Sequence, residues 1–244
     1  MSSSRLVGVG VGPGDPELVT VKGVNALRAA DVVVVPVMDT GEVGRAEATV
    51  VHYVPQEKIL RVVFALNERS DRSRREAAWD AAGEQVAELL RTHGSVAFAT
   101  IGDPNVYSTF TYLAHTIGEL VPDVVVETVP GITAMQDLAA RSGAVLTEGT
   151  EPLTLVPVTA GSAVLKDALN GPGTVVAYKF GRQAAEVAEA LRETGRLDDA
   201  VWGSALGLEA ESIRSAAELD GAPLPYLSTL IAPARRDGSR GGKL

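Results

Sequence analysis

The sequence predicts an α/β protein of two α/β domains, the first built on a largely parallel sheet and the second on a mixed sheet. In the first half, short apolar runs alternate with segments of helical periodicity, the pattern of parallel strands covered by helices on both faces. After Gly149 the apolar runs become more polar and less regular. A length of 244 residues, 45% of them hydrophobic, suffices for one large or two small domains with a packed core.

The first half is predicted to contain five strands. They are expected at residues 5–11, in the run DVVVVPV from Asp31, in KILRVVFAL, in GSVAFAT and in DVVVETV. Continuous apolar runs such as DVVVVPV are typical of central parallel strands, which are buried on both faces. Helices are expected where apolar residues recur at helical spacing, over residues 18–30, 74–92, 107–120 and 133–142.

The second half is expected to contain four strands and two helices. The strands correspond to PLTLVPVTA, GTVVAYKFG, DAVWGSAL and PLPYLSTLIAPA, and the helices to residues 161–169 and 182–194. We expect the domain boundary around Pro122. This gives an N-terminal domain of residues 1–121 with the GPGD loop, a C-terminal domain of residues 122–234, and a glycine-rich, flexible tail of residues 235–244.

The composition of the chain disfavours several classes of partner and ligand. The formal net charge is 22 − 31 = −9, which disfavours nucleic acid as a partner because phosphate backbones are held by basic surfaces. No apolar run reaches the roughly 18 residues of a membrane span, so no membrane partner is expected. There is no cysteine and the three histidines are scattered, so we expect no metal site. The start, MSSSR, has no apolar signal region, which together with the absent cysteines predicts a cytoplasmic protein.

Three glycine-containing loops follow predicted strands of the first half. The first, LVGVGVGPGD, has glycine at positions 8, 10, 12 and 14, and the others are IGDPNVY and VPGITA. Glycine costs backbone entropy but permits close approach, so we expect a ligand against these strand ends. The first loop is no dinucleotide fingerprint, because Pro13 and Asp15 stand where that motif needs glycine. The alternative interpretation is that the loops are only tight turns.

Three segments of the sequence resemble the tetrapyrrole (corrin/porphyrin) methylases. They are VGVGPGDPELVTVKGVNALRAADVVVVP, FATIGDPNVYSTFTYL and VETVPGITAMQDLAARSGAVL, and the similarity extends from Arg5 to about Ala234. Within this family the chain is most similar to the precorrin-2 C20-methyltransferases of cobalamin biosynthesis, through VGVGPGDPEL, GRAEATV and GDPNVYSTFTYL. The resemblance implies two α/β domains with a cleft between them, a homodimer, and S-adenosylmethionine (SAM) as the methyl donor bound in that cleft.

The resemblance also implies which residues contact SAM. They lie in loops after predicted strands of both halves: Pro13, Ile101, Gly102, Asp103, Val106, Tyr107, Thr133, Ala134, Phe180, Ala205 and Leu206. Lys179 is the alternative to Phe180, and SALGLEAESI departs from the family's usual proline-containing turn. Because the family's first loop borders the tetrapyrrole, the resemblance assigns Gly12, Gly14 and Asp15 to substrate binding.

The reaction that the resemblance implies is methyl transfer to the C20 meso carbon of precorrin-2, an electron-rich reduced tetrapyrrole. SAM carries its own leaving group, so the protein mainly has to align the carbon with the methyl group. A proton must then be lost, and Asp103, Asp15 and Tyr107 are the side chains we expect to help. Asp103 has a structural alternative, in which it accepts backbone N–H bonds in its own turn.

The carboxylates of such a substrate require cations on a protein that is acidic overall. We favour Arg45, which follows the second predicted strand; Lys179 and Arg182 are further candidates. A cluster in ERSDRSRRE is more simply a solvated start of a helix, and its members are Arg69, Arg72, Arg74 and Arg75.

Related activities stay open at this stage. The substrate could be cobalt-factor II, or the chain could be a C11 or C17 precorrin methylase or a uroporphyrinogen methylase. Family members that modify ribosomal RNA or the diphthamide precursor are further relatives, and the acidic charge disfavours RNA. A different class of function is a non-catalytic SAM-binding module, which would bind the donor without transferring its methyl group.

Overall fold

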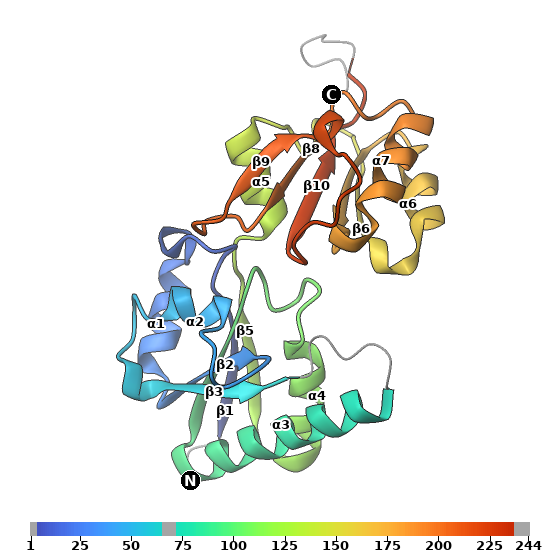
Figure 1. The fold of residues 1–244 in the computed structure, drawn as a ribbon. Coiled ribbons are helices and arrows are strands. Elements are labelled where there is room, and N and C mark those ends of the chain that lie inside the picture. Colours follow the sequence, from blue (N-terminus) through green and yellow to red (C-terminus); the bar gives the residue numbers. More distant parts are fainter. Residues whose placement is uncertain (1–3, 65–71, 237–244) are drawn as a thin grey trace. The chain divides into compact units, whose positions relative to one another are not determined.

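Each half of the chain folds around its own five-stranded sheet (Figure 1). The structure is a computed structural model that describes residues 4–64 and 72–236. The chain divides into two units, Met1–Thr133 (unit 1) and Ala134–Leu244 (unit 2). The predicted class of two α/β domains is confirmed. The division falls between Thr133 and Ala134 instead of around Pro122, because the strand at residues 125–129 pairs with the first strand of unit 1.

The sheet of unit 1 is parallel throughout, as predicted. Its strand order is β3-β2-β4-β1-β5. The strands are β1 (Arg5–Gly10), β2 (Val32–Val37), β3 (Ile59–Val63), β4 (Ser95–Thr100) and β5 (Val125–Val129). Side chains alternate between the two faces of a strand, so Leu6 of β1 packs in one hydrophobic cluster and Val7 and Val9 pack in another.

Two pairs of helices cover the two faces of this sheet. The helices α1 (Val21–Ala29) and α2 (Arg45–Val50) pack on the face of Val7 and Val9. The helices α3 (Arg72–His93) and α4 (Phe110–Leu120) pack on the face of Leu6. The chain therefore leaves β1 toward one face and its neighbour β4 toward the other.

The sequence pattern did not predict α2, and it predicted a start of α4 that lies too early in the chain. The helix α2 has only six residues, too few to show a helical period. The helix α4 begins at Phe110 instead of residue 107, because Tyr107 has a φ of +51°, which a right-handed helix cannot accommodate.

Unit 2 contains a mixed sheet, as predicted, with the order β6-β7-β10-β8-β9. Only β6 and β7 are parallel; the other pairs are antiparallel. The strands are β6 (Leu153–Pro157), β7 (Thr174–Tyr178), β8 (Val201–Ser204), β9 (Ser212–Ser215) and β10 (Ser228–Ala232). The sequence pattern missed β9, because the short polar stretch SIRS carries no strand signal.

Helices cover both faces of the second sheet as well. The helix α5 (Ala134–Ser142) packs on one face through Leu138, and α6 (Ser162–Leu169) and α7 (Ala184–Glu193) pack on the other. Short 3-10 helices complete the two units: η1 (Pro16–Leu18), η2 (Gln56–Lys58), η3 (Val158–Ala160), η4 (Gly181–Gln183) and η5 (Ala216–Glu218). Within residues 4–64 and 72–236, no helix combines the length and the apolar character needed to cross a bilayer.

Three arginines bind the C-terminal segment of unit 2 to the rest of that unit through hydrogen bonds and an ion pair. Arg196 is 3% exposed, and its guanidinium donates to the carbonyl oxygens of Leu169, Gly171, Gly173, Ala232 and Pro233. Burial lowers the pKa of this guanidinium. Two residues of the expected flexible tail are also engaged: Arg236 forms an ion pair with Glu151, and Arg235 donates to the carbonyl of Thr194. The other residues of the expected tail, 237–244, lie outside the described part of the chain.

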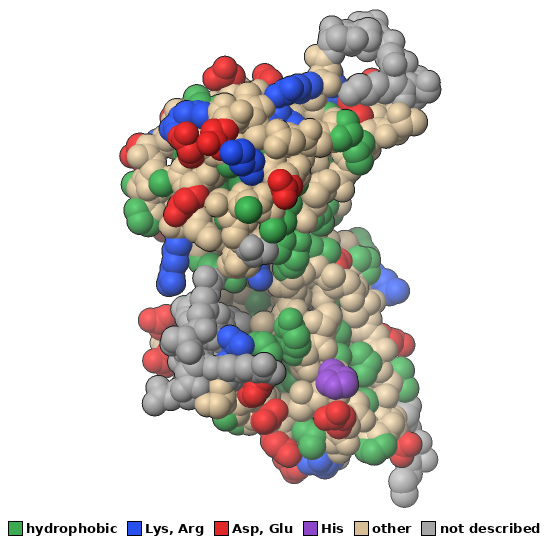
Figure 2. Space-filling model, turned by 90° about the vertical axis from the view of Figure 1, so that its right-hand side faces the viewer, with side chains coloured by type: hydrophobic (Ala, Val, Ile, Leu, Met, Phe, Trp, Pro, Cys, Tyr) green, Lys and Arg blue, Asp and Glu red, His purple; other side chains and the backbone are tan. Residues whose placement is uncertain are grey.

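Charges of both signs occur on the face drawn in Figure 2, where Lys and Arg side chains are interspersed with Asp and Glu. Whether a given Lys or Arg side chain can bind an anionic ligand therefore has to be decided from its own hydrogen bonds and ion pairs.

Candidate functional site

The topology of unit 1 singles out the carboxyl ends of two neighbouring strands in the middle of its sheet. The neighbouring strands β1 and β4 feed helices on opposite faces. In open α/β sheets, ligands bind in the crevice at the carboxyl ends of the two strands where this switch occurs. Here those ends continue into the GPGD loop, residues 11–20, and the loop of residues 101–109. These are two of the three glycine-containing loops that the sequence singled out.

The three loops touch one another backbone to backbone. The Gly102 N–H donates to the Gly12 carbonyl at 2.9 Å. A Cβ on Gly10 would lie 2.5 Å from the Gly102 carbonyl oxygen, and a Cβ on Gly131 would lie only 2.1 Å from the same oxygen. No side chain fits between these segments, since real Cβ contacts essentially never fall below 3.0 Å. Glycine at these positions thus holds the three loops in one cluster.

This contact gives a different reason for the glycines than the one expected from the sequence. We expected a ligand to require the missing side chains. For Gly10 the close neighbour is the protein's own backbone, and for Gly8 it is the ring of Phe110, which would lie 2.5 Å from an added Cβ. Gly12 has a φ of +76°, a conformation that glycine adopts without the cost a side chain brings.

Asp103 closes its own turn through one carboxylate oxygen and links two of these loops through the other. It is 9% exposed. Its Oδ1 accepts the Asn105 N–H at 2.8 Å, and its Oδ2 accepts the Gly131 N–H at 3.0 Å. This is the structural alternative considered from the sequence. The Asn105 side chain adds a bond to the Thr128 hydroxyl of β5 at 3.3 Å, a contact that nothing in the sequence pattern indicated.

Tyr107 occupies an unfavourable backbone conformation. Its φ is +51° and the residue is 42% exposed. A bulky residue in this region costs of order 1–3 kcal/mol, and such residues cluster at functional sites. Next to it, the Ser108 hydroxyl lies 2.9 Å from that of Thr100 and accepts the Phe110 N–H. Desolvation raises the pKa of the Tyr107 phenol, so the phenol is protonated at neutral pH.

The GPGD loop is fixed by its own polar groups. Pro13 and Gly14 are buried. Asp15 begins η1, and its Oδ1 accepts the Glu17 N–H at 2.9 Å. No described residue bonds the other carboxylate oxygen of Asp15. The loop is also held from α2, where the Thr49 hydroxyl donates to the Gly14 carbonyl at 3.3 Å.

Arg45 lies on α2, one helical turn before Thr49. Residues four apart share a helix face, so Arg45 lies on the face of α2 that contacts the GPGD loop. Arg45 is exposed and makes no hydrogen bond or ion pair with any described residue. Displacement of water by neighbouring protein lowers the pKa of its guanidinium, which nevertheless stays cationic at neutral pH because arginine is effectively always protonated in proteins.

A buried ion pair anchors the helix that carries Arg45. Glu47 is 1% exposed and binds Arg61 of β3 in a bidentate arrangement, at 2.6 Å to Nε and 2.8 Å to Nη2. Arg61 also donates to the Thr40 carbonyl in the loop before α2 at 2.7 Å. The hydrogen bond from Arg61 is the main cause that lowers the pKa of the Glu47 carboxyl.

The other cations considered from the sequence have varied surroundings. Arg182 is exposed in unit 2. Arg69 and the side chains of Arg72 and Arg74 lie outside the described part of the chain. The Arg75 guanidinium lies 5.7 Å from the ring centroid of Trp79.

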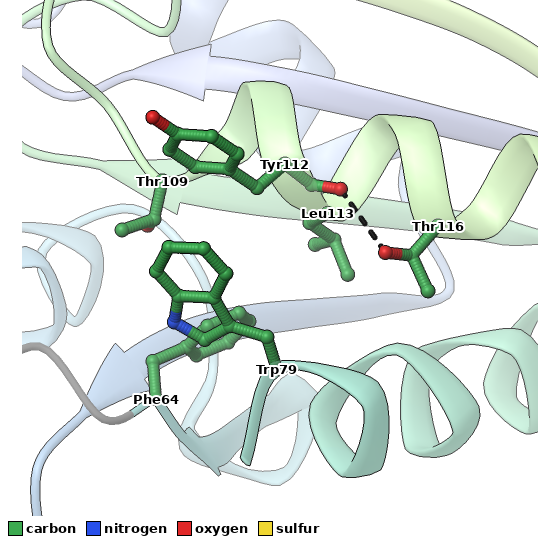
Figure 3. Close-up of a pocket in the computed structure, with 6 residues that line it drawn as sticks. All are labelled: Phe64, Trp79, Thr109, Tyr112, Leu113 and Thr116. Carbon is green, nitrogen blue, oxygen red and sulfur yellow. Dashed lines mark hydrogen bonds between the residues drawn. The ribbon is translucent and has the colours of Figure 1, made fainter. Parts of the chain in front are cut away.

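That ring belongs to a small pocket between α3 and α4 (Figure 3). Trp79 and Tyr112 stack there with ring centroids 4.7 Å apart. Neither is a predicted site residue, and the remaining lining residues are Phe64, Thr109, Leu113 and Thr116. The stacked rings join α3 to α4, so we assign the pocket to packing between the two helices.

Apart from Ala134, the residues predicted for the site in unit 2 lie at the ends of β7 and β8. Lys179 and Ala205 follow these strands directly, with φ of +59° and +50°. Phe180 is fully buried in the hydrophobic core, and Ala205 and Leu206 are 7% and 4% exposed. Because its side chain is buried, Phe180 has only its backbone to offer a ligand.

All non-glycine residues with positive φ in the described chain lie within or directly beside predicted donor segments. They are Tyr107, Lys179 and Ala205. The remaining predicted contacts in these segments are Ile101 and Val106, both partly buried, the buried Thr133, and Ala134 at the start of α5. Together these observations define an α/β protein with strained turns at the carboxyl ends of its strands.

The sequence matches the family model of tetrapyrrole (corrin/porphyrin) methylases over residues 5–220. The chain belongs to this family of methyltransferases. It is 32% identical to the precorrin-2 C(20)-methyltransferase of Sinorhizobium sp over 240 residues, 96% of each chain. It is 28% identical to the cobalt-precorrin-2 C(20)-methyltransferase of Salmonella typhimurium, over 94% of this chain and 96% of that one.

Solved structures show the same fold. A cobalt precorrin-4 methyltransferase from cobalamin biosynthesis superimposes with a TM-score of 0.71 at 21% identity, over 94% of both chains. The uroporphyrin-III C-methyltransferase of Thermus thermophilus, in complex with S-adenosylhomocysteine, gives 0.65 at 22% identity, over 93% of this chain and 96% of that one.

Proposed function

We propose that this protein transfers a methyl group from SAM to C20 of precorrin-2 in cobalamin biosynthesis. The observation that carries the proposal is the likeness to the Sinorhizobium enzyme over 96% of both chains. The binding of S-adenosylhomocysteine by the Thermus thermophilus relative supports SAM as the donor.

The donor contacts that we propose in unit 1 lie in the three loops after β1, β4 and β5: Pro13, Ile101, Gly102, Asp103, Val106, Tyr107 and Thr133. The support is physical: the loops at residues 11–20 and 101–109 start at the switch between β1 and β4, where α/β sheets bind ligands. Their backbone is fixed by the glycine contacts and by Asp103. A preformed backbone loses little conformational entropy on binding.

In unit 2 we propose contacts from Ala134, Phe180 or Lys179, Ala205 and Leu206. The positive φ of Lys179 and Ala205 supports this assignment, because strained residues persist where function requires them. The backbone of these turns, more than the buried side chain of Phe180, is the part available to a ligand.

The substrate contacts that we propose are Gly12, Gly14, Asp15 and Arg45. Arg45 supplies a cation without an ionic partner among the described residues, on the helix face that holds the GPGD loop. It would pair with one of the carboxylates of a tetrapyrrole.

The chemistry that we propose assigns different tasks to the three polar side chains. Asp103 positions the loops, since backbone N–H groups occupy both of its oxygens. Tyr107 donates a hydrogen bond, because its raised pKa keeps the phenol protonated. Asp15 is the carboxylate best suited to accept the proton lost after methyl transfer, since one of its oxygens has no bond to a described residue.

A second substrate, the cobalt-containing form of the same tetrapyrrole, is favoured by the likeness to the Salmonella typhimurium enzyme. We also propose that the protein is a cytoplasmic homodimer that acts on this small molecule and binds no nucleic acid or membrane. Analytical ultracentrifugation would test the dimer by its sedimentation mass.

The test of the function is an anaerobic incubation with methyl-labelled SAM and precorrin-2, read by mass spectrometry and carbon NMR. One labelled methyl group at C20 is the expected result. Binding of SAM without transfer to precorrin-2, but with transfer to cobalt-factor II, would replace the metal-free substrate with the cobalt form. Binding of SAM without transfer to either would leave a SAM-binding module as the function.

A further inference from the structure

Unit 2 contains an ion pair that reaches from α5 to the turn after β8. Arg141, in the last turn of α5, binds both carboxylate oxygens of Glu211 through Nη1 and Nη2. Its Nη1 also lies 3.8 Å from Oδ2 of Asp137, one helical turn earlier, which is 6% exposed. The Arg141 and Glu211 side chains are 39% and 23% exposed, so the pair is partly withdrawn from water.

Glu211 connects this pair to the backbone of the turn. Its Oε2 accepts the Gly207 N–H at 2.7 Å. The turn is otherwise closed by backbone bonds at 3.0 Å, from Leu208 N–H to the Ala205 carbonyl and from Glu211 N–H to the Leu208 carbonyl. Bonds to a charged acceptor are roughly twice as strong as neutral ones. The carboxylate of Glu211 is therefore the strongest single acceptor in this turn.

The turn needs such support because its backbone is strained. Ala205 has a φ of +50° and Gly207 of +72°. An alanine in the left-handed region costs roughly 1–2 kcal/mol and does not stay there without outside constraint. Leu206, between them, packs in one cluster with Leu138 of α5. The hydrophobic contact and the ion pair thus both tie the turn to α5.

We propose that Arg141 and Glu211 are positioning residues for the methyl donor. In this proposal, which rests on the proposed function, Glu211 fixes the Gly207 N–H and thereby the backbone of Ala205 and Leu206. Arg141 orients Glu211 relative to α5, whose first residue, Ala134, is itself a proposed donor contact. The pair acts on SAM through the backbone and touches no reacting atom.

The experiment measures binding of S-adenosylhomocysteine and SAM by calorimetry, together with the KM for precorrin-2. Glu211→Ala should weaken the affinity for both donor ligands at least tenfold and leave the KM for precorrin-2 within twofold. Glu211→Gln should have a smaller effect, because its amide oxygen can still accept the Gly207 N–H while the ionic bond to Arg141 is lost.

The matched control is the ion pair of Lys166 and Glu193, which joins α6 to α7 in the same unit. Glu193→Ala should leave donor affinity unchanged. A charge swap, Arg141→Glu with Glu211→Arg, rebuilds an ion pair but offers Gly207 a donor in place of an acceptor. It should therefore not restore donor affinity.

The outcomes separate the two levels of the proposal. If the unmodified protein binds neither ligand, the proposed function fails. If it binds them and Glu211→Ala and Glu211→Gln bind equally well, the ion pair is structural only and the inference is overturned. Recovery of donor affinity by the charge swap would also overturn it, because the Gly207 bond would then be dispensable.

Discussion

The two units build the turns at their strand ends by different means. In unit 1 the loops after β1, β4 and β5 are held by backbone against backbone, with Gly10, Gly102 and Gly131 in mutual contact. In unit 2 the turn after β8 is held by the side chains of Glu211 and Arg141 in addition to its own backbone bonds. A backbone contact leaves no room for variation, whereas a side-chain contact can be tuned by one substitution. We infer that the shape of the three loops in unit 1 is fixed, whereas the shape of the turn after β8 can be adjusted by substitution.

Gly131→Ala is the substitution that should disrupt the backbone contacts between the three loops of unit 1 most severely. The added Cβ would lie 2.1 Å from the Gly102 carbonyl oxygen and 2.7 Å from the Gly10 Cα, and a backbone cannot move aside cheaply. We expect a loss of about 4 kcal/mol in the free energy of unfolding and no measurable donor binding. Denaturant unfolding followed by circular dichroism measures the first effect.

Gly118→Ala is the matched control for that substitution. An added Cβ at this position in α4 meets nothing within 4 Å, and alanine favours a helix by about 0.8–1.0 kcal/mol over glycine. The control should leave the unfolding free energy equal or higher. Equal stability of both variants would refute the backbone contact.

In unit 2 the corresponding weak point is Arg196, which serves five backbone carbonyls. Arg196→Met fills similar space but leaves those buried acceptors without a donor. We expect a loss of about 3 kcal/mol in unfolding free energy. Arg196→Lys should recover only part of it, since an ammonium cannot reproduce the guanidinium fork.

The control for Arg196 is Arg192→Met, whose side chain is 51% exposed and pairs with Glu189 on the same helix. Exposed pairs of this kind contribute little, so the change should stay small. A comparable loss in both variants would show that the carbonyl bonds of Arg196 add nothing.

A pH experiment sharpens the comparison, because unit 1 also contains a titratable side-chain contact, the ion pair of Glu47 and Arg61. The pKa of Glu47 is lowered in the folded state. Its stabilisation is therefore fully present above the unfolded pKa of about 4.3 and is lost as the pH falls through the lower, folded value. Glu47→Gln should cost about 1–3 kcal/mol at pH 7 and flatten the loss of stability below pH 4.3.

Glu127→Gln provides the reference for that titration, since the pair of Glu127 and Arg5 is about half exposed on both sides. Its unfolding free energy should follow the unmodified protein across the whole pH range. If Glu47→Gln also follows it, the buried pair does not govern acid stability.

The smallest effect is expected from Ala205→Gly. Glycine relieves the left-handed strain at this position, while its greater freedom in the unfolded chain offsets part of the gain. We expect a rise of up to about 1 kcal/mol in unfolding free energy, measured by denaturant titration. A fall would mean that the backbone of this turn is not strained.

Periodicity and turn residues predicted the sheets, most helices and the three loops of unit 1, because these features depend on residues that are close together in the sequence. What escaped prediction depends on distant partners. Glu211 and Arg141 are 70 positions apart, and nothing in SALGLEAESI indicates their contact. The glycines were identified, but their neighbours were not, since the approach of Gly10 to Gly131 exists only after β5 has joined the sheet. Tyr107 interrupted a regular helical pattern through a backbone angle that composition does not reveal.

The position of β1 has a consequence for synthesis on the ribosome. This apolar strand lies between β4 and β5, and Arg5 pairs with Ser95 and Val125. Both neighbours are made long after it, by 95 − 5 = 90 and 125 − 5 = 120 residues. At about 5–20 residues per second, β1 waits roughly 6–24 s for its second partner. Until β4 is made, the nascent chain presents an unpaired apolar strand that a holding chaperone could cover.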